Sequence, residues 1–246
     1  MSPLLRVEDV HIRFGGVVAA DGVYLDLEPG ESLAIIGPNG AGKTTFLNIC
    51  TGYLKPTAGR VLFEGNDITG QPPRAIVRLG IARAFQIPQL FLEHSVLDNM
   101  LIAAAARTRA WNPFRAMVAL PERAEMIGLL RQLGVADTAE QRVDGLPEGV
   151  RKLVDVALAL ALKPRLLLLD EPTSGVSSSE KFQIMDALVQ ALKNQAVTSV
   201  FVEHDMEMVS RYAHRVAVWN GGRVQMVGTP ADVLADADVR RDVVGI

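Results

Sequence analysis

The chain has few cysteines, no excess of charge of one sign and no long hydrophobic run, and each of these absences excludes a class of protein. It contains one cysteine among 246 residues, Cys50, so no disulfide can form within the chain. Charge of either sign is not in excess, because 25 Lys and Arg stand against 28 Asp and Glu and give a formal net charge of −3. That balance argues against a protein that holds nucleic acid through a large basic surface, and no nucleic-acid partner is expected.

Long hydrophobic runs are also missing. A transmembrane helix needs about 20 apolar residues, and the most apolar stretch, residues 153–170, is interrupted. The interrupting residues are Asp155, Lys163, Pro164 and Arg165. The first 14 residues carry four charges where a signal peptide would have its apolar region. We therefore expect a cytosolic protein with no membrane span of its own.

Three apolar runs predict the core of the fold. Residues 32–36 and 165–169 are mainly aliphatic and residues 198–202 are rich in β-branched side chains, which is typical of buried parallel strands. Each run is followed at once by polar residues. Ligands of open α/β sheets bind at the carboxyl ends of such strands, so these polar turns are the candidate site.

Other segments predict an antiparallel sheet and a helical region. Apolar and polar residues alternate over 4–14, 23–27 and 60–64, whereas helical spacing occurs over 95–106, 122–133 and 151–162. Thr229 followed by Pro230 predicts a short helix near the C-terminus. With no repeat or linker in the sequence, the simplest organisation is one α/β domain over 1–246. Its core would comprise 1–86 and 163–246, with an antiparallel β part, and its inserted helical subdomain would be 87–162.

Residues 37–44 match the phosphate-loop pattern G-x-x-x-x-G-K-[ST]. The match has the required context, after an apolar strand ending at Ile36 and before a helix expected over 45–51. Lys43 is expected to contact the β- and γ-phosphates of ATP, and the Thr44 hydroxyl to bind Mg²⁺. A glycine-rich turn without a ligand is the alternative. The predicted nucleotide contacts here are Gly37, Pro38, Asn39, Gly40, Ala41, Gly42, Lys43, Thr44 and Thr45.

Two adjacent carboxylates follow the apolar run 166–169. Asp170 stands at the tip of this strand, where a second Mg²⁺ contact is expected in a phosphate-loop protein. Glu171 follows directly and is predicted to be the general base that activates water for attack on the γ-phosphorus. The alternative for Glu171 is a solvated residue in the turn before Pro172.

The phosphate loop, the Asp-Glu pair and a histidine after the third strand resemble the ATP-binding-cassette (ABC) ATPases. This resemblance covers essentially the whole chain and implies a P-loop NTPase (RecA-like) core. Gln86 is similar to that family's Q-loop glutamine, which senses the γ-phosphate and Mg²⁺, and His204 to its switch histidine. Phe14 resembles the aromatic residue that stacks on adenine. The alternatives are an ordinary loop amide, a structural histidine and a core phenylalanine.

Three further segments are similar to the ATP-binding subunits of branched-chain amino acid importers. These segments are residues 13–16, 50–57 and 81–91. The resemblance implies a pair of cassettes at the cytoplasmic face of the inner membrane, beneath two permease subunits, with a solute-binding protein delivering the substrate. The cluster Leu90-Phe91-Leu92 is a candidate dock for a permease helix, and a buried helix start is the alternative.

One part of the resemblance is incomplete. The family completes a partner's ATP site with a Leu-Ser-Gly-Gly-Gln segment, and the corresponding residues here are Leu146, Pro147, Glu148, Gly149 and Val150. Pro147 has no hydroxyl for a γ-phosphate, and Glu148 adds a negative charge. Ser177 also replaces a usual Asp in the following loop. We therefore expect this chain's own site to be complete and its contribution to a partner to be weak, which favours a heterodimer.

The leading hypothesis is an ATP-hydrolysing subunit that powers amino acid import. One alternative is a cassette ATPase acting on DNA or ribosomes. By resemblance, such proteins usually carry two cassettes in one chain or a very long coiled-coil insert, and this sequence has neither. Another is a regulatory module that binds ATP with weak turnover. A small-molecule kinase would need an arginine-rich lid, whereas the arginines of the helical region lie in a polar stretch around residues 111–113 that is typical of a solvated face. They are Arg107, Arg109, Arg115 and Arg123.

Overall fold

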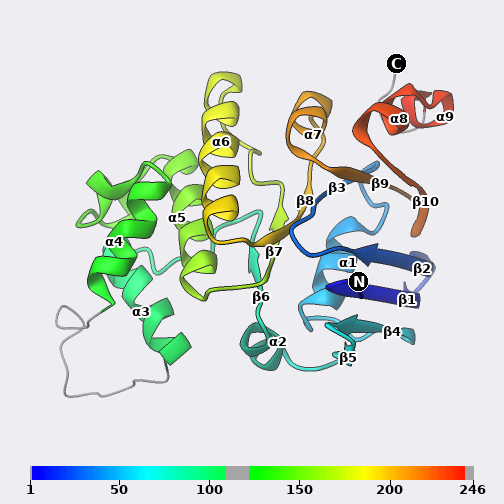
Figure 1. Ribbon diagram of the computed structural model, residues 1–246, viewed down its shortest axis with the longest axis horizontal. Helices are drawn as coiled ribbons and strands as arrows, with labels where there is room; N and C mark the ends of the chain where they lie inside the picture. Colours follow the sequence, from blue (N-terminus) through cyan, green and yellow to red (C-terminus); the bar gives the residue numbers. More distant parts are fainter. Residues whose placement is uncertain (1, 109–121, 242–246) are drawn as a thin grey trace.

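The computed structural model describes residues 2–108 and 122–241, and a six-stranded sheet lies at its centre (Figure 1). The order of the strands is β10-β9-β3-β8-β7-β6. Pairing is parallel from β9 to β6 and antiparallel between β9 and β10. The strands are β3 (Ser32–Ile36), β6 (Ile81–Ala84), β7 (Leu166–Asp170), β8 (Thr198–Val202), β9 (Arg215–Asn220) and β10 (Arg223–Gly228).

Both faces of the central sheet are covered, which explains its continuous apolar runs. In β3, Leu33 and Ile35 pack into one hydrophobic cluster, while Ala34 and Ile36 pack into another on the opposite face. Successive side chains of a strand point to opposite faces, so a strand buried on both sides has no polar alternation. The three predicted parallel strands are confirmed, with β7 shifted by one residue.

The antiparallel sheet lies on one side of the central sheet. Its order is β2-β1-β4-β5, with β1 (Leu5–Phe14), β2 (Val17–Leu27), β4 (Ala58–Phe63) and β5 (Asn66–Asp67). The strand predicted over 23–27 is therefore too short. Alternation is broken around Asp21 and Gly22, but a register shift between β1 and β2 absorbs the irregularity, so the pairing continues to Val17.

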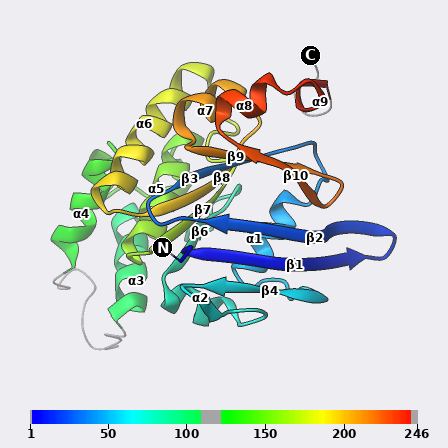
Figure 2. The ribbon, with the colours of Figure 1, turned by 45° about the vertical axis from the view of Figure 1, so that its right-hand side comes forward.

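Most of the helices pack on the opposite face of the central sheet or at one end of the molecule, whereas the first two pack on the same face as the antiparallel sheet. They are α1 (Lys43–Cys50), α2 (Pro73–Leu79), α3 (Val96–Thr108), α4 (Arg123–Gln132), α5 (Glu148–Ala161), α6 (Ser178–Asn194), α7 (Met206–Tyr212), α8 (Pro230–Ala235) and α9 (Ala237–Val239). Two 3₁₀ turns, Ala136–Thr138 and Val143–Gly145, lie between α4 and α5. Helices α3, α4 and α5 follow β6 and precede β7, and Figure 2 shows them at the end away from the tips of β1, β2 and β4.

The helix predictions are confirmed, but two helices begin earlier than predicted, α1 by two residues at Lys43 and α5 by three residues at Glu148. The segments 95–106, 122–133 and 151–162 form α3, α4 and α5, and the Thr229 side chain caps α8 by accepting from Asp232 N. The first helix begins at Lys43 instead of residue 45, because Gly42 adopts a left-handed conformation (φ 105°) that ends the loop there. Four helices, α2, α6, α7 and α9, and four strands, β5, β6, β9 and β10, were not predicted.

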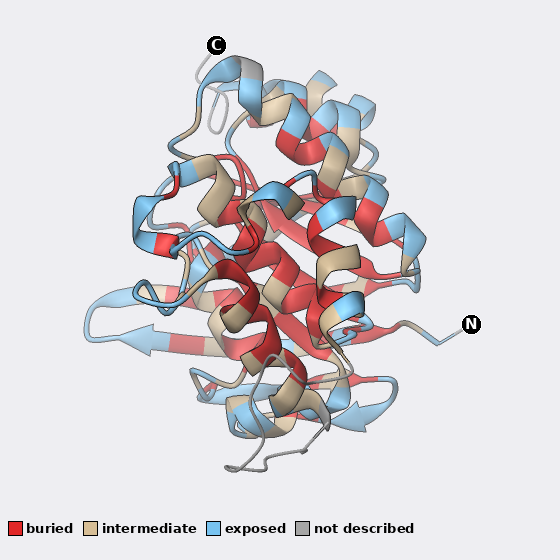
Figure 3. Cartoon of the chain, turned by 90° about the vertical axis from the view of Figure 1, so that its left-hand side faces the viewer, coloured by how far each residue is buried: buried red, intermediate tan, exposed pale blue. Residues whose placement is uncertain are grey.

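The buried residues form two clusters, one on each face of the central sheet. Figure 3 shows them along the central strands and on the inward faces of the helices. Within residues 2–108 and 122–241 there is no helix with the length and apolar character that crossing a membrane requires.

Two of the arginines considered for a kinase lid, Arg107 and Arg123, form ion pairs within the helical region, and the pair of Arg107 links α3 to α4. Arg107 donates through both terminal nitrogens to Glu125 at 3.0 and 2.9 Å, and Arg123 donates to Glu140 at 2.7 Å. Arg107 also caps the Ala161 carbonyl at 2.7 Å. The other residues of that alternative, Arg109, Arg115 and the stretch 111–113, lie outside the described residues.

Candidate functional site

The predicted phosphate loop connects β3 to α1 and depends on glycine at two positions. A Cβ atom at Gly37 would lie 2.0 Å from the Trp219 carbonyl oxygen, and one at Gly42 would lie 2.0 Å from the Ala19 carbonyl oxygen. Neither approach is sterically possible for another residue. The loop therefore passes directly against the backbone of β9 and β2, which fixes its path before any ligand binds.

Lys43, the first residue of α1, points back into this loop. Its Nζ donates to the carbonyl oxygens of Gly37 at 2.7 Å and Pro38 at 2.9 Å, and the residue is only 6 % exposed. Burial lowers the pKa of Lys43, and the nearby carboxylates of Glu171 and Asp170 oppose this change. A buried cation with two neighbouring carboxylates and a helix N-terminus is a suitable partner for a phosphate group.

A hollow of about 230 Å³ lies over the phosphate loop. Phe14 and Val17 form part of its wall and are 47 % and 61 % exposed. The core alternative for Phe14 is therefore wrong, and its ring is accessible beside the loop. The remaining lining residues are Ala19, Asn39, Gly40, Ala41, Gly42, Lys43, Thr44, Thr45 and Glu171.

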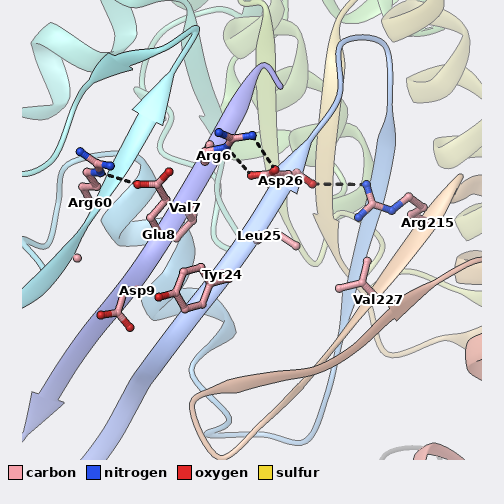
Figure 4. Close-up of a pocket in the computed structure, with 11 residues that line it drawn as sticks. Arg6, Val7, Glu8, Asp9, Tyr24, Leu25, Asp26, Arg60, Arg215 and Val227 are labelled. Atoms are coloured by element: carbon pink, nitrogen blue, oxygen red, sulfur yellow. Dashed lines mark hydrogen bonds and ion pairs between the residues drawn. The ribbon is translucent and has the colours of Figure 1, made fainter. Parts of the chain in front are cut away.

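A larger hollow of about 750 Å³ lies on the antiparallel sheet and on Arg215 and Val227 (Figure 4). Arg6 donates to Asp26 at 3.1 Å, and Arg60 to Glu8 at 2.5 Å. These ion pairs neutralise the charges that could attract a ligand, and exposed pairs of this kind contribute little to stability. The larger hollow is therefore not the candidate site. The smaller hollow is, because it is lined by the phosphate loop and Glu171.

Asp170 ends β7 and forms a buried ion pair. One of its oxygens, Oδ2, accepts from Arg83 at 2.6 Å, and the two side chains are 3 % and 5 % exposed. Arg83 also donates to Asn48 Oδ1 at 2.6 Å and lies over the Phe85 ring, 4.8 Å from its centroid. Arg83 was not predicted from the sequence, because no motif indicates that it pairs with Asp170, 87 residues away.

The second oxygen of Asp170 fits a divalent cation. Among the described residues, Asp170 Oδ1 is buried and has no hydrogen-bond partner. A buried carboxylate oxygen without a donor is costly and is suited to a hard cation such as Mg²⁺. Thr44, which lines the hollow, adds a hydroxyl oxygen, and Mg²⁺ commonly binds one or two protein oxygens together with nucleotide phosphates. The residues present therefore fit magnesium bound with a nucleotide.

Glu171 lies next to Asp170 and meets two other predicted residues. Its Oε2 accepts from Gln86 Nε2 at 2.8 Å, and its Oε1 lies 3.0 Å from His204 Nε2. Gln86 follows β6, Glu171 follows β7 and His204 follows β8, which are neighbouring parallel strands. The sheet thus brings three residues from distant parts of the chain into one hydrogen-bonded cluster beside the phosphate loop.

Two charged residues of α5 contact the segments that carry this cluster. Lys152 Nζ donates to the Glu171 carbonyl oxygen at 3.0 Å, and Asp155 Oδ2 accepts from Phe85 N at 2.8 Å. Neither residue was predicted from the sequence to belong to the site. Their signal was available, because they place charges three residues apart inside an apolar helical pattern.

The altered segment 146–150 forms the start of α5. Pro147 occupies the N-cap position and Glu148 lies in the first turn. The Glu148 carboxylate lies against Gly175, since a Cβ atom there would be 2.5 Å from Glu148 Oε1. Ser177, which replaces the usual Asp, forms a capping box with Glu180 at the start of α6. These two substitutions therefore have local structural roles within this chain.

Apolar side chains are exposed around the segment after β6. Ile87 is 75 % exposed, Phe91 54 %, Leu92 48 % and Tyr53 57 %. The alternative of a buried helix start is wrong for Phe91 and Leu92, because α3 begins only at Val96 and these side chains reach solvent. We call these four residues the apolar patch.

A strand–glycine loop–helix unit, with carboxylates at the carboxyl end of another strand of the same sheet, defines a P-loop nucleotide hydrolase. Residues 20–174 match the family described as ABC transporter. The chain is 34 % identical over 252 residues to the high-affinity branched-chain amino acid transport ATP-binding protein LivG of Escherichia coli (strain K12), covering 99 % of this chain and 98 % of that protein. The chain therefore belongs to the ABC transporter family and is an ATPase of that family.

Two solved structures are similar over almost their full length. One is a nucleotide-free ATP-binding cassette from an ABC transporter, with 31 % identity, a TM-score of 0.85 and coverage of 96 % of this chain and 97 % of that one. The other is the ADP conformation of an ATP-binding cassette of an ABC transporter, with 29 % identity, a TM-score of 0.85 and complete coverage of both chains. The predicted P-loop NTPase fold and nucleotide as ligand are thus confirmed.

Proposed function

We propose that this protein binds ATP with Mg²⁺ and hydrolyses it to power the import of branched-chain amino acids. The hydrogen-bonded cluster of Gln86, Glu171 and His204 beside the phosphate loop carries the catalytic part of the proposal. The similarity to LivG supports the choice of solute, because that relative is described as a branched-chain amino acid transport protein. The same similarity favours transport over a role on DNA or ribosomes, and the complete cluster favours turnover over a regulatory module.

The proposed reaction is attack of water on the γ-phosphorus. Lys43 and the amides of residues 37–45 bind the phosphates, and Phe14 stacks on the adenine. Glu171 accepts the proton of the attacking water, while Gln86 and His204 orient its carboxylate through their hydrogen bonds. Thr44, Asp170 and Gln86 would hold Mg²⁺, which would neutralise negative charge at the phosphates.

The proposed partners are transmembrane permease subunits, contacted through the apolar patch. Exposed apolar side chains are typical of protein–protein contacts, which supports this docking surface. The similarity to transport ATP-binding subunits favours a peripheral position at the cytoplasmic face of the inner membrane. A solute-binding protein would deliver the amino acid. In this proposal, residues 87–162 act as a helical subdomain between the core segments 1–86 and 163–246.

A second ATP-binding subunit is also part of the proposal. Because residues 146–150 lack the serine and glutamine of the family segment, this chain would contribute weakly to a partner's site while keeping its own. We therefore propose a heterodimer with one efficient site. A single-subunit preparation that hydrolyses ATP as fast as the whole complex would contradict this part.

The experiment is reconstitution of this subunit with its permease subunits and solute-binding protein in proteoliposomes. We expect ATP-dependent uptake of radiolabelled leucine, and loss of ATP binding with Lys43→Ala. Uptake of a different class of solute would overturn the choice of substrate alone. Normal ATP binding and uptake by the Lys43→Ala complex would overturn the proposed ATP site.

A further inference from the structure

Two charged residues, Lys152 and Asp155, lie on the buried face of α5, where the other side chains are mostly apolar. Lys152 is 4 % exposed and Asp155 is 6 % exposed. Residues three apart lie on the same side of a helix, so both point into the molecule together. Their buried neighbours on α5, such as Val154 and Leu160, are apolar and belong to the main hydrophobic cluster. Buried charges are costly unless their partners compensate for the lost hydration.

Asp155 holds the segment that contains Gln86. Its Oδ2 accepts from Phe85 N at 2.8 Å, and its Oδ1 lies 3.4 Å from Gln89 N, which also donates to it. The carboxylate thus binds the backbone on both sides of Gln86, one residue before it and three residues after it. Burial raises the pKa of Asp155 to about 6, and the two amide hydrogen bonds oppose this change.

Lys152 holds the turn that contains Glu171. Its Nζ donates to the Glu171 carbonyl oxygen at 3.0 Å and to Ser174 Oγ at 2.7 Å. Glu171 has a φ of 51°, a left-handed conformation that a residue with a side chain adopts only when its surroundings hold it there. The ammonium group therefore fixes the carbonyl of a strained residue.

The two segments meet through the 2.8 Å hydrogen bond from Gln86 Nε2 to Glu171 Oε2. We propose that Lys152 and Asp155 are positioning residues for ATP hydrolysis, which set Gln86 and Glu171 relative to one another from adjacent turns of α5. This inference rests on the proposed function, because it assumes that Glu171 acts in hydrolysis. Neither residue touches the nucleotide in this proposal, and each acts through the backbone that it holds.

The test is the steady-state ATPase activity of the co-purified transporter complex carrying Lys152→Met or Asp155→Ala. We expect kcat to fall roughly 10-fold to 100-fold, as small misplacements of catalytic groups do, while the KM for ATP changes less than about 2-fold. Lys152→Arg should restore part of kcat, because it keeps a cation and donors. Lys163→Met is the control, since this lysine is 63 % exposed and pairs with Glu125 instead.

Two further measurements separate positioning from a general structural effect. Amide hydrogen exchange in residues 85–89 should accelerate in Asp155→Ala and stay unchanged in the Lys163→Met control. In a Gln86→Ala background, Asp155→Ala should cost little additional kcat, because residues that act through the same group are not additive. If Lys152→Met or Asp155→Ala does not fold, Lys152→Arg and Asp155→Asn replace them with the same expected split between kcat and KM.

Three outcomes overturn the inference. They are an unchanged kcat in both variants, a parallel loss of kcat and nucleotide affinity, and full additivity with Gln86→Ala. The proposed function is tested separately, because Glu171→Gln should abolish turnover whatever Lys152 and Asp155 do. Turnover lost in Glu171→Gln but kept in Lys152→Met and Asp155→Ala would reject the positioning role alone.

Discussion

The Nε2 of His204 lies 3.0 Å from Oε1 of Glu171, although the two residues are 33 positions apart in the chain. On the other side, Gln86 donates to Oε2 of the same carboxylate. This arrangement follows from the order of the strands, because β7 lies between β8 and β6. The strand on either side of β7 therefore places one residue, Gln86 or His204, beside one oxygen of the Glu171 carboxylate.

Replacing this carboxylate should separate binding from turnover. In Glu171→Gln the amide keeps the size of the side chain but cannot accept a proton from water. We expect ATP binding to remain near wild type and kcat to fall by about 100-fold or more, which is the usual contribution of a general base. Nucleotide titration and phosphate release measure the two quantities.

The matched control for that variant is Glu207→Gln. Glu207 is an exposed glutamate in the first turn of α7, three residues after His204. The Glu207→Gln variant should leave both ATP binding and kcat unchanged. A Glu171→Gln protein that still turns over ATP would remove the general-base role from this residue.

The buried pair of Arg83 and Asp170 predicts a large effect on stability. Asp170→Asn leaves the Arg83 guanidinium without its carboxylate partner in a buried site. We expect the free energy of unfolding to fall by about 3–5 kcal/mol in urea titrations. The double variant Asp170→Leu with Arg83→Met should recover part of this loss, because no unpaired charge remains.

An exposed ion pair provides the control for that experiment. Arg6 and Asp26 are 44 % and 47 % exposed, and Asp26→Asn should leave the free energy of unfolding nearly unchanged. Equal losses for Asp170→Asn and Asp26→Asn would contradict the importance that we assign to the buried pair.

The two glycines Gly37 and Gly40 should respond differently to alanine. Both have positive φ, so each substitution carries a backbone cost of about 1–2 kcal/mol. At Gly37 the new Cβ also collides with the Trp219 carbonyl, whereas no described atom lies within 4 Å of a Cβ at Gly40. Gly37→Ala should therefore lose roughly 1–3 kcal/mol more than Gly40→Ala in denaturant unfolding. Similar losses would show that the loop can move away from β9.

The ion pairs of Glu125 should stabilise the folded protein to an extent that depends on pH. Hydrogen bonds from Arg107 and then Lys163 lower its pKa from 4.5 to about 2. A carboxylate with a lowered folded-state pKa stabilises the protein above about pH 4.5, and this contribution is lost as the pH falls toward 2. The difference in unfolding free energy between wild type and Glu125→Gln should thus be clear at pH 7 and smaller at pH 3. Glu140→Gln, with a carboxylate 73 % exposed, is the control and should show little difference at pH 7.

Local patterns predicted much of the fold, and they failed where distant segments decide the outcome. The strand β3, the phosphate loop and α1 are contiguous, so sequence spacing alone located them. The alternation of β1 predicted its strand, but the extent of β2 depends on a register shift with its neighbour. The start of α1 depends on the left-handed conformation of Gly42, which the close approach of Ala19 enforces.

The same division applies to the site. By itself the sequence determined the phosphate loop, the Asp170–Glu171 pair and the continuous apolar strands, because these depend on residues next to each other in the chain. Only the tertiary structure decided that Gln86 and His204 share the Glu171 carboxylate, that Arg83 neutralises Asp170, and that α5 reaches both segments. Such contacts depend on strand order and helix packing, which place residues 19 to 87 positions apart within hydrogen-bond distance.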